Sequence, residues 1–557
     1  MSLVIPAAVL LPVKSQIKSP LISTAISQGR VSLRNGEDDP DAEVSLNIAA
    51  FDLDALVELR GFCDSAGNMK AVRVLDAVLK AKGGAIDSKV PSFGAFLPML
   101  QAYLHHDRID GWIYAEAADG CLYPELILSA TFNDNKGYKN KPDPHVVITT
   151  LAFGLDADAR SRSEGARTRA HTFRPDDALH KPVAEILAAS GLFKESRARK
   201  YKYQKSMERF DAEVRLKFAE QFRVTGRCFA FDNGSYRRRG EMLDNRRVIH
   251  DQEARELPQS QRFMESSLFD AEDFLGQVPV HPLVKVFDLK SHEFMWVHSD
   301  YMTPYQYNAS LKDKLILPPE MHDLLSILTT NLGVFVDDFI EGKSAGNVVL
   351  IKGPPGVGKT LTAEVYAEVI KRPLFAVHTG TLGTSAEDIH RNLKETFARI
   401  ERWNCVGLID EADVYVRSRG EDLEQNAIVA EFLRSAEYFR GLLFMTTNRV
   451  NDIDDAFLSR VAACISYSEP GPELAAKVWR TMAEQFEHPL DDATVAGLID
   501  AFPMLRPRDA KMLFRLALRV ANAHNEPLTV DVFRRCAMFR AIPAYQKSPG
   551  VKELANV

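Results

Sequence analysis

The stretch NVVLIKGPPGVGKTLTAEVYAEV, residues 347–369, decides how the second half of this 557-residue chain folds. Its centre, Gly353–Thr360, reads GPPGVGKT and fits the pattern GxxxxGK[ST]. An apolar run typical of a strand precedes this loop, and a helix-forming segment follows it. Glycines let backbone N–H groups turn towards a phosphate, and the N-terminus of the following helix adds positive potential. The stretch therefore predicts a strand–loop–helix unit that holds the phosphates of a nucleotide.

The side chains of this loop have distinct expected roles. Lys359 would reach the β- and γ-phosphates, and Thr360 would hold Mg²⁺. ATP and Mg²⁺ are therefore the expected ligands. The residues that we expect to contact the nucleotide here are Gly353, Pro354, Pro355, Gly356, Val357, Gly358, Lys359, Thr360 and Leu361.

Two later apolar runs end in polar residues that suit the same chemistry. In CVGLIDEAD, Asp410 is placed to bind Mg²⁺ through water, and Glu411 is placed to polarise the attacking water as a general base. In LLFMTTN, the amide of Asn448 could hydrogen-bond the attacking water or the γ-phosphate. Carboxylates at strand ends are common, and asparagine there is also a turn former. The position of the two carboxylates, on another strand of the same predicted sheet, favours the catalytic interpretation.

The apolar pattern also predicts the fold class. From Asn347 onwards, short apolar runs alternate with amphipathic segments: NVVLI, LFAV, CVGLID, LLFMTT and ACISY. This alternation predicts an α/β fold, a parallel sheet with crossover helices, and the segments from Glu473 onwards predict a helical domain behind it. The expected division is an amino-terminal α+β domain (1–180), a helical and β-hairpin region leading to a linker (181–310), the nucleotide-binding core (311–470), a helical lid (471–545) and a tail (546–557).

These elements, in this order, resemble the AAA+ ATPases, and among them the AAA subgroup with the arginine-bearing stretch TTNRVNDIDDAFLSR. Over roughly Leu311–Pro470 the chain is similar to fungal-type AAA ATPases of poorly defined function. The resemblance implies a P-loop core with a helical lid, and rings, usually hexamers, with ATP bound between neighbours. It implies that Asn448 is the sensor-1 residue and that Arg508, or alternatively Arg506, is the sensor-2 arginine. It also implies that Arg460 is an arginine finger that reaches the γ-phosphate held by the adjacent subunit.

The sequence departs from the family pattern in two places. Many relatives end the arginine stretch with an RPGRFDR-like segment, whereas LSRVAA is two residues shorter and has Ala463 where the second arginine would stand. Threading relatives carry an aromatic residue on the loop after the second strand, whereas this chain has HTGTLGTS. Leu382 and Gly383 are therefore the candidate pore-loop residues, and a grip on polypeptide is expected to be weak.

Charge is distributed unevenly along the chain. The net charge of the chain is −7, which does not suggest a polyanion binder as a whole. The segment Lys194–Arg247 nevertheless holds 16 Lys/Arg against 8 Asp/Glu, a net of +8. It is either a solvated region with internal ion pairs or a docking face for an acidic partner or nucleic acid. No nucleic-acid-binding motif supports the last option.

Several other classes of protein are disfavoured. The six cysteines are scattered without a CxxC pair, which argues against a disulfide framework or a zinc site and favours a reducing compartment, the cytoplasm. The run SHEFMWVHS lacks the H-E-x-x-H spacing of a zinc protease. The apolar start, LVIPAAVLLPV, is shorter than a membrane span and has no basic leader, so we expect a strand or buried arm and no membrane association.

Together these features predict an ATP-hydrolysing ring protein that remodels or releases a protein partner recognised by residues 1–300. One alternative is a nucleotide-gated assembly switch that produces little force. A second is a motor directed to nucleic acid, suggested only by the basic segment.

Overall fold

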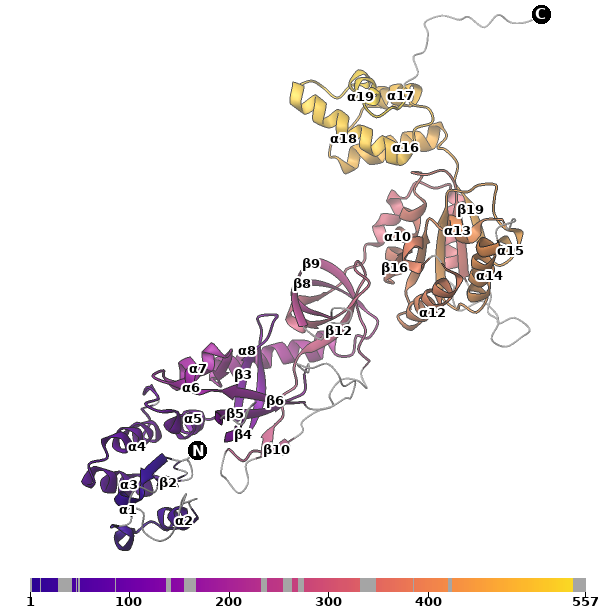
Figure 1. The fold of residues 1–557 in the computed structure, drawn as a ribbon. Coiled ribbons are helices and arrows are strands. Elements are labelled where there is room, and N and C mark those ends of the chain that lie inside the picture. The colour runs from indigo at the N-terminus through magenta and orange to yellow at the C-terminus, as the bar shows by residue number, and fades with distance from the viewer. Residues whose placement is uncertain are drawn as a thin grey trace, which may run out of the picture.

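The computed structural model describes residues 3–10, 12–28, 43–46, 48, 51–85, 87–136, 142–154, 167–231, 238–253, 263–268, 275–330, 347–383, 385–418 and 423–543. The expected tail, residues 546–557, lies outside them. Within these ranges, no helix combines the length and the apolar character that crossing a bilayer requires. Figure 1 shows an amino-terminal sheet unit, a barrel, an α/β core and a helical unit following one another along the molecule.

The amino-terminal unit packs helices against an antiparallel sheet of strand order β6-β5-β4-β3-β7. Three helices, α3, α4 and α5, cover this sheet, and Asp52 caps the first of them by accepting a hydrogen bond from the Ala55 N–H. Phe96 of α5 packs edge-on against Phe173 of β6, with ring centroids 5.7 Å apart. The elements are β1 (Leu3–Pro6), α1 (Ala7–Leu10), η1 (Lys14–Gln16), α2 (Pro20–Gln28), β2 (Glu43–Leu46), α3 (Leu53–Ser65), α4 (Met69–Lys82), α5 (Phe93–His105), β3 (Trp112–Glu116), β4 (Leu122–Lys136), β5 (Pro142–Ala152), β6 (Arg167–Phe173), α6 (Pro175–Ala178), α7 (Val183–Ala189), β7 (Leu192–Lys194) and α8 (Arg197–Arg209).

This first sheet extends past residue 180. Strand β7 pairs antiparallel with β3, with Phe193 opposite Tyr114, although β7 belongs to the segment expected to follow the first domain. The domain limits given above stay a prediction.

A small antiparallel barrel follows. Its strand order is β13-β12-β9-β8-β14, and an additional pairing between β13 and β8 closes the sheet. Strand β8 can pair with β14 at one end and β13 at the other because it bends at an irregularity between Val224 and Gly226. A Cβ atom on Gly226 would lie 2.4 Å from the Tyr301 ring, so only glycine fits this bend. The elements are η4 (Phe210–Val214), β8 (Gln221–Phe231), β9 (Arg238–His250), β10 (Phe263–Glu265), β11 (Leu275–Gln277), β12 (Leu283–Asp288), β13 (Phe294–His298), η6 (Ser299–Tyr301) and β14 (Met302–Pro304).

The α/β core contains the predicted parallel sheet, in the order β16-β17-β18-β15-β19. The strands pair in phase, for example Leu350 with Met445 and Leu408 with Phe444, so their carboxyl ends meet at one edge. The elements are η7 (Ala309–Lys314), α9 (Pro319–Thr330), β15 (Asn347–Lys352), α10 (Lys359–Val369), β16 (Leu374–His378), α11 (Thr379–Leu382), α12 (Ala386–Arg402), β17 (Val406–Asp410), α13 (Asp413–Val416), α14 (Leu423–Glu437), β18 (Leu442–Thr447), α15 (Asp455–Leu458) and β19 (Ala463–Ser466).

The predicted helical segments after the sheet are α16 (Pro472–Gln485), α17 (Asp492–Ala501), α18 (Pro507–His524) and α19 (Val530–Met538). They enclose a core of their own. Phe533 packs edge-on against both Trp479 and Phe514, with ring centroids 5.4 and 5.5 Å apart. This lid is therefore a separately packed unit, which residues 467–471 join to the last strand of the sheet.

Candidate nucleotide site

The phosphate loop lies where the central strand β15 meets α10. Gly353, Gly356 and Gly358 have φ angles of +151°, +85° and +109°, which only glycine adopts without strain. Gly353 also passes so close to the carbonyl oxygen of Tyr467 that a Cβ atom would lie 2.6 Å from it. The conformation of the loop therefore requires glycine, which has no Cβ atom, at these positions.

Lys359, the first residue of α10, lies at the centre of the loop. Its Nζ donates hydrogen bonds to the carbonyl oxygens of Gly353 and Pro354, both at 2.8 Å, and to Oδ1 of Asn448 at 2.9 Å. Burial lowers the pKa of Lys359, while the carboxylates of Asp410 and Asp413 act in the opposite direction. The ammonium group thus lies between the loop and the residue at the end of β18.

The two carboxylates predicted at the end of β17 have different surroundings. Asp410 Oδ1 accepts a hydrogen bond from Thr360 Oγ1 at 3.0 Å and another from Thr446 Oγ1. Glu411 is exposed, has a φ angle of +57°, and donates its backbone N–H to Thr446 Oγ1 at 3.1 Å. Hydroxyl and carboxylate oxygens that meet in this way fit the donor set that Mg²⁺ prefers. The sequence analysis did not single out Thr446, whose hydroxyl contacts both the Asp410 carboxylate and the Glu411 backbone.

Asn448 is held by a residue that the sequence analysis also missed. Asp413 Oδ1 accepts the backbone N–H of Asn448 at 2.9 Å and the hydroxyl hydrogen of Thr447. Asp413 is the last acidic residue of CVGLIDEAD, so its position three residues after the end of the strand was visible in the sequence.

The two arginines considered in the lid differ in their contacts. Arg506 pairs with Glu469, at 3.0 Å between Nη2 and Oε1. Arg508 is exposed, lines the cavity above the phosphate loop, and donates its backbone N–H to the Gly356 carbonyl at 3.1 Å. Arg508 therefore lies at the cavity, whereas Arg506 forms an ion pair with Glu469, just after the last strand of the sheet.

The cavity around these residues has a volume of about 770 Å³, within the range of ligand pockets. Of the residues predicted to contact nucleotide, those in its lining are Pro355, Gly356, Gly358, Lys359, Thr360, Leu361, Asp410, Glu411, Asn448 and Arg508. Gly353 and Pro354 instead contribute carbonyl groups to Lys359, and Val357 is buried. The cavity also continues along α10 to Gln221 and Arg247 of the barrel, which no sequence motif marked.

Residues 349–468 match the model of the ATPase family associated with various cellular activities, AAA. The chain carries an AAA ATPase domain. It is 30% identical over 154 residues to the uncharacterized AAA family ATPase y4kL of Sinorhizobium fredii, covering 27% of this chain and 46% of that one. It is 28% identical over 210 residues to Fidgetin-like protein 1 of Drosophila melanogaster (34% and 40%), and 26% identical over 243 residues to the proteasome-associated ATPase of Salinispora tropica (37% and 41%).

The chain thus spans less than half the length of these curated relatives. Among solved structures, the FIGL-1 AAA domain aligns with a TM-score of 0.35 and 18% identity, covering 43% of this chain and 86% of that one.

Arg460 of the AAA domain lies away from the cavity of its own chain. It is exposed, follows α15, and donates from Nη1 to the carbonyl oxygen of Ala456 at 2.9 Å. It is not among the described residues that line the cavity.

Leu382, one of the two candidate pore-loop residues, is buried in this chain. Its side chain is 1% exposed and belongs to the apolar cluster of the AAA domain that also contains Phe375 and Leu393. It ends the short helix α11, and Asn392 holds its carbonyl oxygen at 3.1 Å. Gly383 has a φ angle of +100° and passes close to Asp388, where a Cβ atom would lie 2.7 Å away. Leu382 is buried because it packs with apolar side chains of β16 and α12, and this removes its apolar surface from water.

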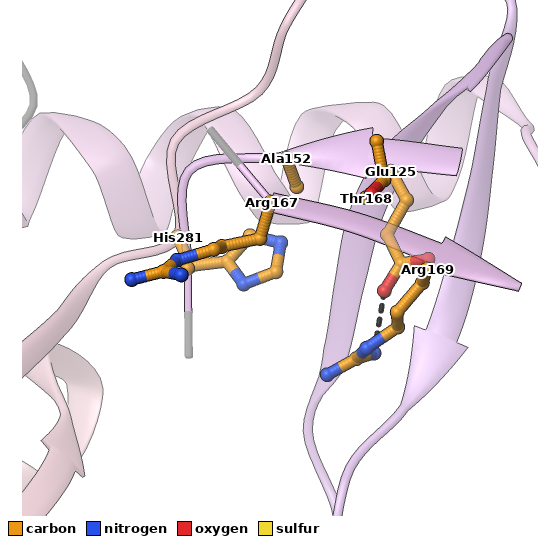
Figure 2. Close-up of a pocket in the computed structure, with 7 residues that line it drawn as sticks. Glu125, Ala152, Arg167, Thr168, Arg169 and His281 are labelled. Atoms are coloured by element: carbon orange, nitrogen blue, oxygen red, sulfur yellow. Dashed lines mark hydrogen bonds and ion pairs between the residues drawn. The ribbon is translucent and has the colours of Figure 1, made fainter. Parts of the chain in front are cut away.

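A second, small cavity lies in the amino-terminal unit (Figure 2), far along the chain from the AAA domain. Its volume is about 10 Å³, enough for one water molecule. Glu125 there is 3% exposed and accepts from Arg169 Nη1 at 2.5 Å, Thr150 Oγ1 at 2.6 Å and His171 Nε2 at 3.0 Å. Burial alone would raise the pKa of Glu125, but these hydrogen bonds and the charge of Arg169 lower it to about 2. Glu125 thus has hydrogen-bond partners for its buried carboxylate, and the cavity beside it is too small for a substrate.

No group of three or more potential metal ligands occurs among the residues described. His292 and Glu293 lie in the turn between β12 and β13, and His298 ends β13, so the run SHEFMWVHS forms a hairpin and not a protease helix.

Many cations of the basic segment are paired with nearby acids. Such pairs include Lys200 with Asp110, Arg209 with Glu213, Arg215 with Asp211, Lys217 with Glu220, and Arg246 with Asp288. Three of these five pairs lie within the segment itself, which favours the interpretation of a solvated region with internal ion pairs.

Proposed function

We propose that the protein hydrolyses ATP at this site and uses the energy to remodel or release a protein partner. The observation that carries the proposal is the pair of contacts at one edge of the sheet. Lys359 Nζ donates to Asn448 Oδ1 at 2.9 Å, and beside it Thr360 Oγ1 donates to Asp410 Oδ1 at 3.0 Å. An ammonium, an amide, a hydroxyl and a carboxylate are the groups that bind a nucleotide triphosphate with its metal.

Each residue then has a role in hydrolysis. Lys359 binds the phosphates, and Thr360 and Asp410 hold Mg²⁺, which when bound neutralises charge on the phosphate oxygens. Glu411 is exposed beside Asp410 and accepts a proton from the attacking water. Asn448 orients that water or the γ-phosphate, and Arg508 contacts the phosphates from the lid.

Arg460 acts on the neighbouring subunit. Its exposure and its absence from the lining of its own cavity support a role in trans, at the nucleotide of an adjacent copy in a ring. We expect a homo-oligomer, a hexamer by resemblance to the AAA subgroup, working in the cytoplasm.

The partner is expected to be a protein that binds within residues 1–300. The relative named as a proteasome-associated ATPase supports this class of partner. Nucleic acid has less support, because many cations of the basic segment are engaged in ion pairs.

A nucleotide-gated assembly switch is the second candidate, and the buried Leu382 favours it. No described residue between β16 and α12 presents a large exposed apolar side chain that could grip a polypeptide. The exposed Glu411, which a mere switch does not require, favours hydrolysis.

Two variants test the proposal. Lys359→Ala should abolish binding of a fluorescent ATP analogue, because the phosphates lose their main counter-charge. Glu411→Gln should bind the analogue as the parent does and lose phosphate release, because only water activation is removed. Glu387→Gln, at an exposed position of α12, is the matched control and should behave as the parent.

Turnover near the parent rate in Glu411→Gln would show that another group is the base. A parent protein that binds no ATP would refute the proposed function. Stimulation of turnover by unfolded polypeptide, by nucleic acid or by neither separates a protein-directed motor, a nucleic-acid motor and a switch.

A further inference from the structure

The barrel contacts the AAA domain at two separate places. The first is aromatic: Phe287 of β12 packs against Phe375 of β16 and against Trp403, with ring centroids 5.5 and 4.7 Å apart. Trp403 follows α12, so this contact joins a barrel strand to the edge of the parallel sheet.

A buried acid strengthens the same contact. Asp251, at the end of β9, is 0% exposed and accepts a hydrogen bond from Trp403 Nε1 at 2.6 Å. Arg402 of the AAA domain approaches this carboxylate at 3.3 Å, and Lys285 of the barrel approaches it at 3.5 Å. A buried carboxylate that takes partners from both units holds them in one arrangement, because separating the units would leave its charge unpaired.

The second contact is on α10, the helix that begins with Lys359. Glu368 of α10 accepts a hydrogen bond from Tyr305 Oη at 2.6 Å and one from the Asn308 N–H at 2.9 Å. Arg247 of β9 lies 3.9 Å from the same carboxylate, whose side chain is only 12% exposed. Glu368 therefore ties the nucleotide-binding helix to the barrel and to the segment that leaves it.

The barrel also forms one wall of the nucleotide cavity. Arg247 and Gln221 line the cavity together with Lys359 and Asp410. Gln221 is 5% exposed, and its Nε2 has no hydrogen-bond partner among the residues that the structure describes. A helix rises 1.5 Å per residue, so Glu368 lies about 14 Å along α10 from Lys359. The phosphate loop and the barrel contact are thus the two ends of one short, rigid element.

We propose that Glu368 couples nucleotide binding to docking of the barrel. The proposal rests on the proposed function, because it assigns a regulation to the same nucleotide site. Nucleotide that fixes the start of α10 favours the docked barrel, and by reciprocity the docked barrel favours nucleotide. Glu368 is a positioning residue: it acts through α10 and through the cavity wall that Arg247 and Gln221 complete.

Hydrogen exchange with and without ATPγS and Mg²⁺ tests this in the full chain. Nucleotide should slow exchange at the phosphate loop and, by about fivefold or more, at residues 245–251 and 305–308. Glu368→Gln should keep the effect at the phosphate loop and lose it at the two distant segments. Tyr305→Phe, which removes only the hydroxyl that Glu368 accepts, should reduce the distant effect. Glu387→Gln is the matched control: it makes the same chemical change at an exposed position of α12, and Glu387 is not among the described residues that line the cavity.

The outcomes separate the two proposals. Protection confined to the phosphate loop in the parent, or distant protection that survives in both Glu368→Gln and Tyr305→Phe, would overturn the coupling and leave the proposed function intact. Absence of protection at the phosphate loop in the parent would refute the proposed function, and the coupling with it.

Discussion

Replacing Leu382 with alanine should destabilise the AAA domain without removing a grip on substrate. Leu382 is 1% exposed within the apolar cluster that contains Phe375 and Leu393. Truncating a fully buried leucine removes its transfer free energy and leaves a cavity, which costs about 2–5 kcal/mol of unfolding free energy. For a domain of this size the midpoint of thermal unfolding should fall by roughly 5–20 °C.

The assay is thermal unfolding of the parent and the variant, followed by nucleotide turnover at a temperature where both are folded. Leu324→Ala is the matched control, because Leu324 on α9 is 41% exposed and its truncation should cost under about 1 kcal/mol. Turnover of Leu382→Ala below its melting range should resemble that of the parent. Parent-like melting combined with loss of ATP-dependent partner remodelling would refute this reasoning and show that the side chain works in a pore.

Three further outcomes are expected. Arg460→Ala should bind ATP normally and hydrolyse it about 10³-fold more slowly, and mixing it with Lys359→Ala subunits should restore turnover; no restoration, with a monomer in sedimentation under ATP, contradicts a role in trans. Arg508→Ala should weaken nucleotide binding, measured by titration, more than Arg506→Ala, because Arg506 is held by Glu469; equal effects would contradict this assignment. Burial lowers the pKa of His281 to about 4, so the buried neutral imidazole contributes stability that is fully present above pH 6.5 and is lost as the pH falls towards 4. Urea titrations at several pH values should show a smaller loss of unfolding free energy at low pH in His281→Gln than in the parent. An identical pH dependence in the two proteins would exclude His281 as its source.

Much of the nucleotide site follows from local sequence. The glycines of the phosphate loop allow its backbone path, because three of them have positive φ angles that other residues rarely adopt. Apolar runs of strand length fixed the five parallel strands, and in-phase pairing of such strands brings Asp410 and Asn448 to the same edge as Lys359. These features depend on a few neighbouring residues and on the geometry of parallel sheets, so they can be predicted from the sequence alone.

The remaining features depend on contacts between residues that are distant in sequence. Leu382 looked like a loop residue because its position is polar on both sides, and only the packing of β16 against α12 turns it inwards. Arg506 and Arg508 are indistinguishable in LRPRDAKML until Glu469 engages the first of them. Gln221 and Arg247 reach the nucleotide cavity only because the barrel docks on the AAA domain, through Glu368 of α10 and through the Asp251–Trp403 hydrogen bond. A sequence specifies the backbone of a loop locally, whereas which side chains surround a cavity is decided by how separately folded units pack together.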